Sequence, residues 1–138
     1  EKAKPVTEAY SDTGVNVEVC EFISDMANAY QQADLLICRA GALTVAEVSA
    51  IGVPAIFIPM PAAVDDHQTK NAMALVEQGG ARLLPQAKLI SGELVTCCKE
   101  LLIEPGKLLA MAKAARASAI TDATEQVAAE CKQLAAAN

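Results

Sequence analysis

Short apolar runs alternate with helix-like segments in the middle of the chain, and this alternation constrains the fold more than any other feature. In the stretch "DLLICRAGALTVAEVSAIGVPAIFIP", Asp34–Cys38 and Ala55–Ile58 are predicted strands, and Leu43–Ala50 between them is a predicted helix. A Gly-Val-Pro sequence stops this helix. Buried strands joined by a helix pair in parallel through a right-handed crossover. The pattern therefore predicts an α/β fold on a parallel sheet.

Two further strands and several further helices complete the expected fold. Val15–Phe22, which is rich in β-branched residues, and Ala81–Leu84 are the additional predicted strands. Helices are expected over Asp25–Gln32, over Asp66–Gln78, from a cap at Ser91 to about Leu102, and through the Ala-rich tail at 107–137. The four strands would form a Rossmann-like sheet with helices on both faces, within one domain spanning residues 1–138.

Charge and hydropathy narrow the classes of partner. The 138 residues carry a net charge of −6, which disfavours nucleic acid and an anionic membrane as partners of this surface. Prolines interrupt the longest apolar stretch, so no membrane span is expected and the chain should be soluble. Five cysteines without a C-x-x-C pattern indicate a reducing compartment with structural thiols. Because the sequence begins without Met, we expect it to be part of a longer protein.

The first candidate site follows the predicted strand that ends at Cys38. Ligands of such sheets bind beyond the carboxyl ends of the strands. There Gly41 permits a tight turn, and the amides at the start of the following helix could hold a diphosphate. Glu47, one turn further on, could accept hydrogen bonds from two sugar hydroxyls. The alternative is that Thr44 and Glu47 form a capping box and nothing more.

The second candidate site lies at the start of the helix expected at Asp66. Asp65, Asp66, His67, Gln68 and Asn71 form an unusually polar group, and amide side chains suit sugar hydroxyls because each offers a donor and an acceptor. The alternative is a helix cap in which Asp65 and Gln68 reciprocate. His67 is the single histidine and has no partner with metal-ligand spacing, so no metal is expected.

A third candidate, Phe22–Ser24, follows the first predicted strand. Its backbone groups could pair with the edge of a flat heterocycle. Plain core packing by Phe22 and Ile23 is the alternative.

These segments together resemble one family. "EFISDMANAYQQADLLICRAG", "RAGALTVAE", "GVPAIFIPMPAAVDDHQTKNA" and "ASAITDATEQVAAE" are similar to the carboxyl-terminal half of the MurG family, two-domain glycosyltransferases of the GT-B type. The resemblance covers essentially the whole chain. It implies transfer of N-acetylglucosamine (GlcNAc) from UDP-GlcNAc to lipid I, giving lipid II in peptidoglycan synthesis, with inversion and without a cofactor or tightly bound metal. The other half of such enzymes binds lipid I and the cytoplasmic face of the inner membrane.

The resemblance also assigns nucleotide contacts. The backbone of Ile23 would meet the uracil, and Glu47 would hold the ribose hydroxyls. The diphosphate would lie along the start of the helix after Gly41, lined by Ala42, Leu43, Thr44, Val45 and Ala46.

Contacts with the sugar fall in the second candidate site. Gln68 would hold GlcNAc hydroxyls with Asn71 nearby, and Asp66 and His67 flank that position as possible sugar contacts. The catalytic base would belong to the absent amino-terminal half and stays unassigned. We therefore expect the chain alone to be inactive and to bind UDP-GlcNAc weakly.

Three alternative functions remain open at this point. The chain could be the donor-binding subunit of a split glycosyltransferase. It could belong to another UDP-sugar enzyme, such as a glycolipid glucosyltransferase or an epimerase. It could also be a regulatory Rossmann-like domain without a ligand.

Overall fold

The computed structural model describes residues 3–61 and 66–136. The chain divides into two compact units, Glu1–Gln32 and Ala33–Asn138, which are described separately. The expected loop at Pro59–Val64 lies partly outside the described residues.

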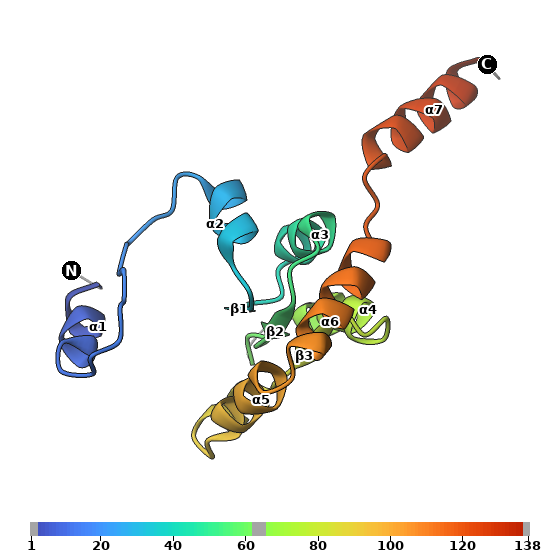
Figure 1. The fold of residues 1–138 in the computed structure, drawn as a ribbon. Coiled ribbons are helices and arrows are strands. Elements are labelled where there is room, and N and C mark those ends of the chain that lie inside the picture. Colours follow the sequence, from blue (N-terminus) through green and yellow to red (C-terminus); the bar gives the residue numbers. More distant parts are fainter. Residues whose placement is uncertain (1–2, 62–65, 137–138) are drawn as a thin grey trace. The chain divides into compact units, whose positions relative to one another are not determined.

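The second unit is built on a parallel sheet of three strands in the order β1-β2-β3 (Figure 1). These strands are β1 (Leu36–Cys38), β2 (Ala55–Phe57) and β3 (Ala81–Leu83). The backbone pairing continues at both ends of β1, where Leu36 N donates to Pro54 O at 2.9 Å and Ile58 N donates to Cys38 O at 2.8 Å. The predicted α/β class with parallel strands is confirmed.

The first predicted strand, Val15–Phe22, is wrong. Residues 14–20 have no regular secondary structure, and the side chains of Val15 and Phe22 are 61% and 84% exposed. A β-branched segment becomes a strand only when a neighbouring strand satisfies its backbone groups and covers its side chains. In the unit that contains this segment, the described buried core consists of Tyr30 alone, so that support is lacking.

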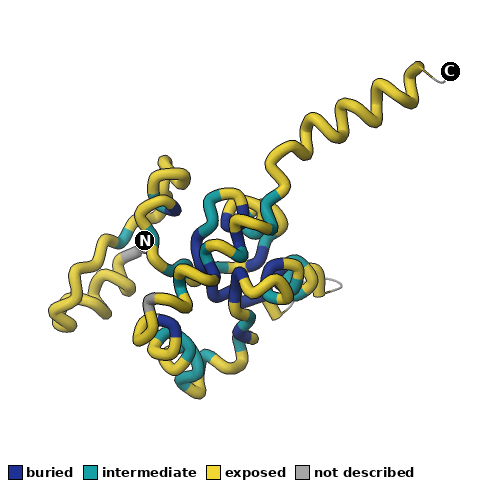
Figure 2. The backbone as a smooth tube through the Cα atoms, turned by 45° about the vertical axis from the view of Figure 1, so that its right-hand side comes forward, coloured by how far each residue is buried: buried dark blue, intermediate teal, exposed yellow. Residues whose placement is uncertain are grey.

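Helices make up the remaining regular secondary structure of the described residues, and all but those at 3–10 and 86–89, which were not expected, lie close to the expected positions. In the first unit they are α1 (Ala3–Tyr10) and α2 (Met26–Gln32); in the second they are α3 (Ala42–Ile51), α4 (His67–Val76), η2 (Gln86–Leu89), α5 (Glu93–Leu102), α6 (Pro105–Ala117) and α7 (Ala123–Ala136). The helical tail is confirmed as α6 and α7, although all of α7 is exposed (Figure 2). The cap of α5 is Gly92, one residue after the expected Ser91.

Two apolar clusters cover the two faces of the sheet, as expected. Phe57 on one face packs with Val48 of α3 and Leu75 of α4, all fully buried. Ile56 points to the opposite face and packs with Leu101 of α5. The strand order β1-β2-β3 advances in one direction across the sheet. Two right-handed crossovers in that direction both run over the same face, so α3 and α4 lie on one face of the sheet.

Helix α6 packs closely against the chain just before β3. A Cβ added to Gly80 would lie 2.8 Å from both the Cα and the backbone N of Ala115, which is fully buried. Backbone atoms cannot move aside as a flexible side chain can. Gly80 is therefore required by the packing of α6.

We expect Gly80→Ala to lower the free energy of unfolding by about 1–3 kcal/mol, since overpacking at this site must displace backbone. Gly106→Ala is the matched control, because Gly106 lies in α6 with nothing within 4 Å of an added Cβ. Its expected effect is a gain of up to about 1 kcal/mol from helix propensity. Urea unfolding of both variants measures the difference, and equal effects of the two substitutions would contradict the packing argument.

Candidate functional site

The start of α3 presents backbone amides at the carboxyl edge of the sheet. Gly41 is the N-cap residue, and the first intrahelical hydrogen bond runs from Val45 N to Gly41 O at 2.9 Å. Helix geometry leaves the amides of Ala42, Leu43 and Thr44 without an acceptor one turn earlier. No side chain of the described residues caps this helix. Such amides, together with the helix dipole, favour an anion.

This helix start excludes the capping-box alternative for Thr44 and Glu47. A capping box needs its Ser or Thr at the N-cap, but the helix begins at Ala42, so Thr44 is its third residue. Glu47 is exposed and lies five residues beyond Ala42, or about 7.5 Å along the helix axis. Thr44 and Glu47, three residues apart, share one face of α3. The carboxylate therefore lies beyond the uncapped amides, on the same face as Thr44.

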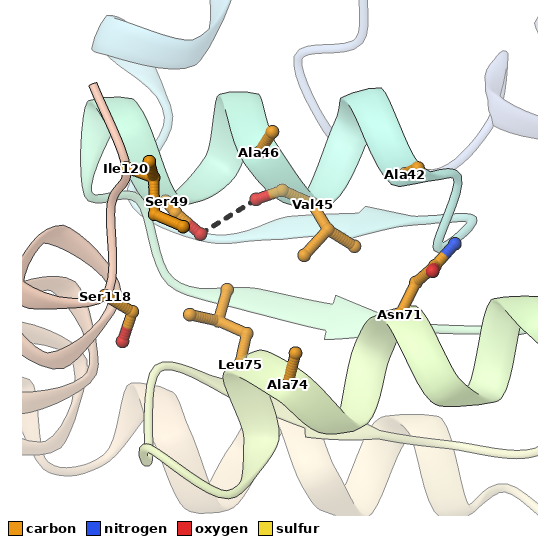
Figure 3. A pocket seen from close by; sticks show the side chains of 9 residues that line it. All are labelled: Ala42, Val45, Ala46, Ser49, Asn71, Ala74, Leu75, Ser118 and Ile120. Atoms are coloured by element: carbon orange, nitrogen blue, oxygen red, sulfur yellow. Dashed lines mark hydrogen bonds between the residues drawn. The ribbon is translucent and has the colours of Figure 1, made fainter. Parts of the chain in front are cut away.

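Asn71 of α4 holds the loop that carries these amides. Its Nδ2 donates to the carbonyl oxygen of Ala40 at 3.2 Å, and Ala40 is fully buried. Figure 3 shows the Asn71 side chain pointing toward the start of α3, beside Ala42. Asn71 thus has a structural role in addition to the sugar contact predicted for it.

The start of α4 has an unusual backbone. Asp66, its N-cap, has φ +51°, and its Oδ1 accepts a hydrogen bond from Thr69 Oγ1 at 2.6 Å. Gln68 Oε1 accepts the amide of Met60 at 3.0 Å, so it holds the preceding loop. The alternative cap through Asp65 lies outside the described residues. His67 is the exposed first residue of α4.

A cavity of about 260 Å³ is lined by side chains of both α3 and α4. Val45 and Leu75 point toward one another across it, while Ser118 and Ile120 lie at the far end (Figure 3). Four of its lining residues belong to the predicted nucleotide and sugar contacts: Ala42, Val45, Ala46 and Asn71. The structure therefore brings the α3 start and part of the α4 group to one cavity.

Ile23 belongs to the other unit, Glu1–Gln32, and is described within that unit. It is 42% exposed and lines a separate pocket with Phe22, Ser24 and Asn28. Asp25 caps α2 beside it, since its Oδ1 accepts Asn28 N at 3.0 Å. The alternative of core packing by Phe22 and Ile23 is wrong, because both side chains are exposed.

Sequence reasoning missed the contacts of Arg39. Its guanidinium donates to the carbonyls of Ile58 and Pro59, each at 3.0 Å, and to Gln86 Oε1 at 2.7 Å. The only sequence signal for these contacts was the position of an arginine directly after a predicted buried strand. Its acceptors, however, lie 19 to 47 residues further along the chain.

The thiol of Cys38 lies at the end of β1 and is half-buried. Burial raises the pKa of Cys38 from 9.0 to about 11. Cys38 therefore stays protonated at neutral pH and behaves as part of the core. Cys20, which belongs to the segment Val15–Phe22 predicted as a strand, is exposed.

A group of metal ligands or a membrane-spanning helix would change the class of this site. In the ranges 3–61 and 66–136, no group of three His, Cys, Asp or Glu side chains is placed to hold a metal ion. None of the helices over those same residues combines the length and the hydropathy needed to span a bilayer.

The three-stranded parallel sheet, with the uncapped start of α3 at its carboxyl edge, defines an α/β domain of the Rossmann-like type. Residues 1–127 match the glycosyltransferase family 28 C-terminal domain, and the chain belongs to this family. The resemblance drawn from the motifs is confirmed.

Two relatives of the chain carry the same name. It is 58% identical over 130 residues to a UDP-N-acetylglucosamine–N-acetylmuramyl-(pentapeptide) pyrophosphoryl-undecaprenol N-acetylglucosamine transferase from Aeromonas hydrophila, covering 94% of this chain and 36% of the relative. The Tolumonas auensis protein of the same name is 52% identical over 133 residues, covering 96% and 38%. The chain thus spans a little over a third of the length of these relatives.

A solved structure shows the same fold. The crystal structure of MurG from Acinetobacter baumannii matches 96% of this chain and 40% of its own, with a TM-score of 0.88 and 40% sequence identity. The Rossmann-like fold predicted from the sequence is therefore that of a carboxyl-terminal part of such an enzyme.

We expect Cys38 to react slowly with iodoacetamide, because at pH 8 its thiolate fraction is roughly a hundredfold below that of an ordinary thiol with a pKa of 9.0. Exposed Cys20 and Cys131 should be alkylated first, as read by peptide mass spectrometry. Cys38 binds its proton more tightly in the folded protein than in the unfolded chain. The stability that the protonated thiol contributes is therefore lost as the pH rises from 9.0 through about 11. Labelling in urea is the control, and fast labelling of Cys38 in the folded chain would contradict its burial.

Proposed function

We propose that this chain is the donor-binding domain of a glycosyltransferase that moves GlcNAc from UDP-GlcNAc to lipid I, giving lipid II. The observation that carries this proposal is the start of α3. There the amides of residues 42–44 lack a side-chain cap among the described residues, at the edge where such sheets bind ligands. Relatives named as N-acetylglucosamine transferases support the choice of sugar and acceptor.

The diphosphate of the donor would lie on these amides. Ala42, Leu43 and Thr44 would donate to phosphate oxygens, and Val45 and Ala46 would continue this contact along the cavity. An acidic chain, with a net charge of −6, holds an anion more readily through fixed local dipoles than through its overall field.

The carboxylate and amide side chains would recognise the two sugars. Glu47 would accept hydrogen bonds from the ribose hydroxyls. Gln68 would bind GlcNAc hydroxyls from the start of α4, with Asn71 nearby. Asp66 and His67 would flank the sugar, and the backbone of Ile23 would meet the uracil.

The chemical contribution of this domain would be to stabilise the leaving group. When an acceptor hydroxyl attacks the anomeric carbon with inversion, the bond to the UDP oxygen breaks and negative charge builds on the diphosphate. Preorganised amides at the start of α3 lower the energy of that developing charge. The acceptor proton would pass to a base supplied by the remainder of the enzyme.

The remaining parts of the reaction would come from outside this chain, which covers 36% of its Aeromonas relative. We infer that an amino-terminal half binds lipid I and the cytoplasmic face of the inner membrane. The 138-residue chain alone would then bind UDP-GlcNAc weakly and transfer nothing.

A transfer assay with a labelled donor tests the proposal. We expect the full-length protein to convert lipid I to lipid II with UDP-GlcNAc and to use UDP-glucose poorly, while the chain alone is inactive. Transfer from UDP-glucose alone would favour a different UDP-sugar enzyme. Absence of transfer, together with absence of a saturation-transfer NMR signal from UDP, would contradict a donor-binding role.

We expect Glu47→Gln in the full-length enzyme to weaken UDP-GlcNAc binding by roughly 1–3 kcal/mol, because a charge-assisted hydrogen bond to the ribose is lost. Glu77→Gln is the matched control, since Glu77 is also exposed but caps the opposite end of α4. Isothermal calorimetry measures the affinity, and circular dichroism checks that both variants fold. If the two variants bind alike, Glu47 is not a ribose ligand.

A further inference from the structure

One side chain joins the exits of all three strands. Arg39 is the first residue after β1, and its guanidinium reaches the carbonyls of Ile58 and Pro59, which follow β2. The same group reaches Gln86 on η2, the helical turn that follows β3. These three acceptors are separated from Arg39 by 19, 20 and 47 residues.

The geometry of this contact is specific to arginine. Ile58 and Pro59 are buried residues, and their carbonyls accept partly buried hydrogen bonds from the Arg39 guanidinium. Arginine offers five N–H groups in a rigid planar fork, and three hydrogen bonds in different directions use that fork. A lysine ammonium is a single point on a flexible stem and cannot reproduce the arrangement.

The guanidinium lies between the two loops that would hold the donor. On one side, Arg39 precedes Ala40, whose carbonyl Asn71 binds, and Gly41, the N-cap of α3. On the other side, Pro59 precedes Met60, whose amide Gln68 binds. We call residues 39–41 the diphosphate loop, and residues 58–60 together with the start of α4 the sugar-binding segment. Both are therefore attached to the same guanidinium.

We propose that Arg39 and Gln86 are positioning residues, which fix the diphosphate loop and the sugar-binding segment relative to one another without touching the donor. This inference rests on the proposed function. Gln86 acts only through Arg39: its Oε1 orients the fork so that the other two hydrogen bonds form. Through this contact η2, whose residues do not line the cavity, also influences the affinity for the donor.

Steady-state kinetics of the full-length enzyme test the proposal. We expect Arg39→Lys to raise the KM for UDP-GlcNAc roughly tenfold while the KM for the acceptor stays unchanged. Gln86→Ala should raise the donor KM about threefold. Gln86→Glu should keep it close to that of the unaltered enzyme, because a carboxylate still accepts the hydrogen bond.

Arg116→Lys is the matched control. Arg116 of α6 donates to the carbonyl of Ala50, near the opposite end of α3, so it makes the same kind of contact away from the site. A purely structural loss lowers the fraction of active enzyme, and thus the apparent kcat, but leaves the donor KM unchanged. We expect that result for Arg116→Lys.

The outcomes separate this inference from the proposed function. A donor KM within twofold of the unaltered value in Arg39→Lys, or an equal rise in Arg116→Lys, overturns the positioning role while transfer itself stands. Equal rises in both Gln86 variants overturn the role of that hydrogen bond. If the unaltered enzyme neither binds nor transfers, both proposals fail. Should Arg39→Lys not fold, the two Gln86 variants decide.

Discussion

The parallel pairing of β1 with β2 is the constraint on which the rest of this unit depends. Leu36 N to Pro54 O and Ile58 N to Cys38 O bracket that pairing at its two ends. With the register fixed, the loops after Cys38 and after Phe57 leave the sheet at one edge. Helices α3 and α4 then begin close together, which allows Asn71 to hold the Ala40 carbonyl and the cavity to form between them.

Much of this fold could be predicted, because its signals are local. The strand expected at Ala55–Ile58 is observed at Ala55–Phe57, and the helix expected at Leu43–Ala50 is observed at Ala42–Ile51. Apolar runs, a Gly-Val-Pro stop and helical periodicity all act over a few residues. Val15–Phe22 failed because a strand depends on a partner elsewhere in the chain, and β propensity carries no information about that partner.

The site was less accessible to sequence reasoning, because its geometry depends on single residues and distant contacts. Whether Thr44 caps a helix or lies inside it turned on three residues of helix boundary, since the observed N-cap is Gly41, and boundaries are the part of a helix that sequence patterns locate least well. The residue types themselves, an acid in α3 and amides in α4, could be found from spacing and from resemblance. The contact of Arg39 with Gln86 could not, since no local pattern joins residues 47 apart.

The glycine at the N-cap of α3 has an evolutionary consequence. A Ser or Asp at position 41 would be a better cap than Gly41 by roughly a few tenths of a kcal/mol. The same side chain would occupy the amides that the proposed diphosphate needs, and an aspartate would repel it. Selection for a thermally hardier protein and selection for substrate capture therefore pull this position in opposite directions. A homologue with a self-capped helix here would be a candidate for a lineage that has abandoned nucleotide sugars.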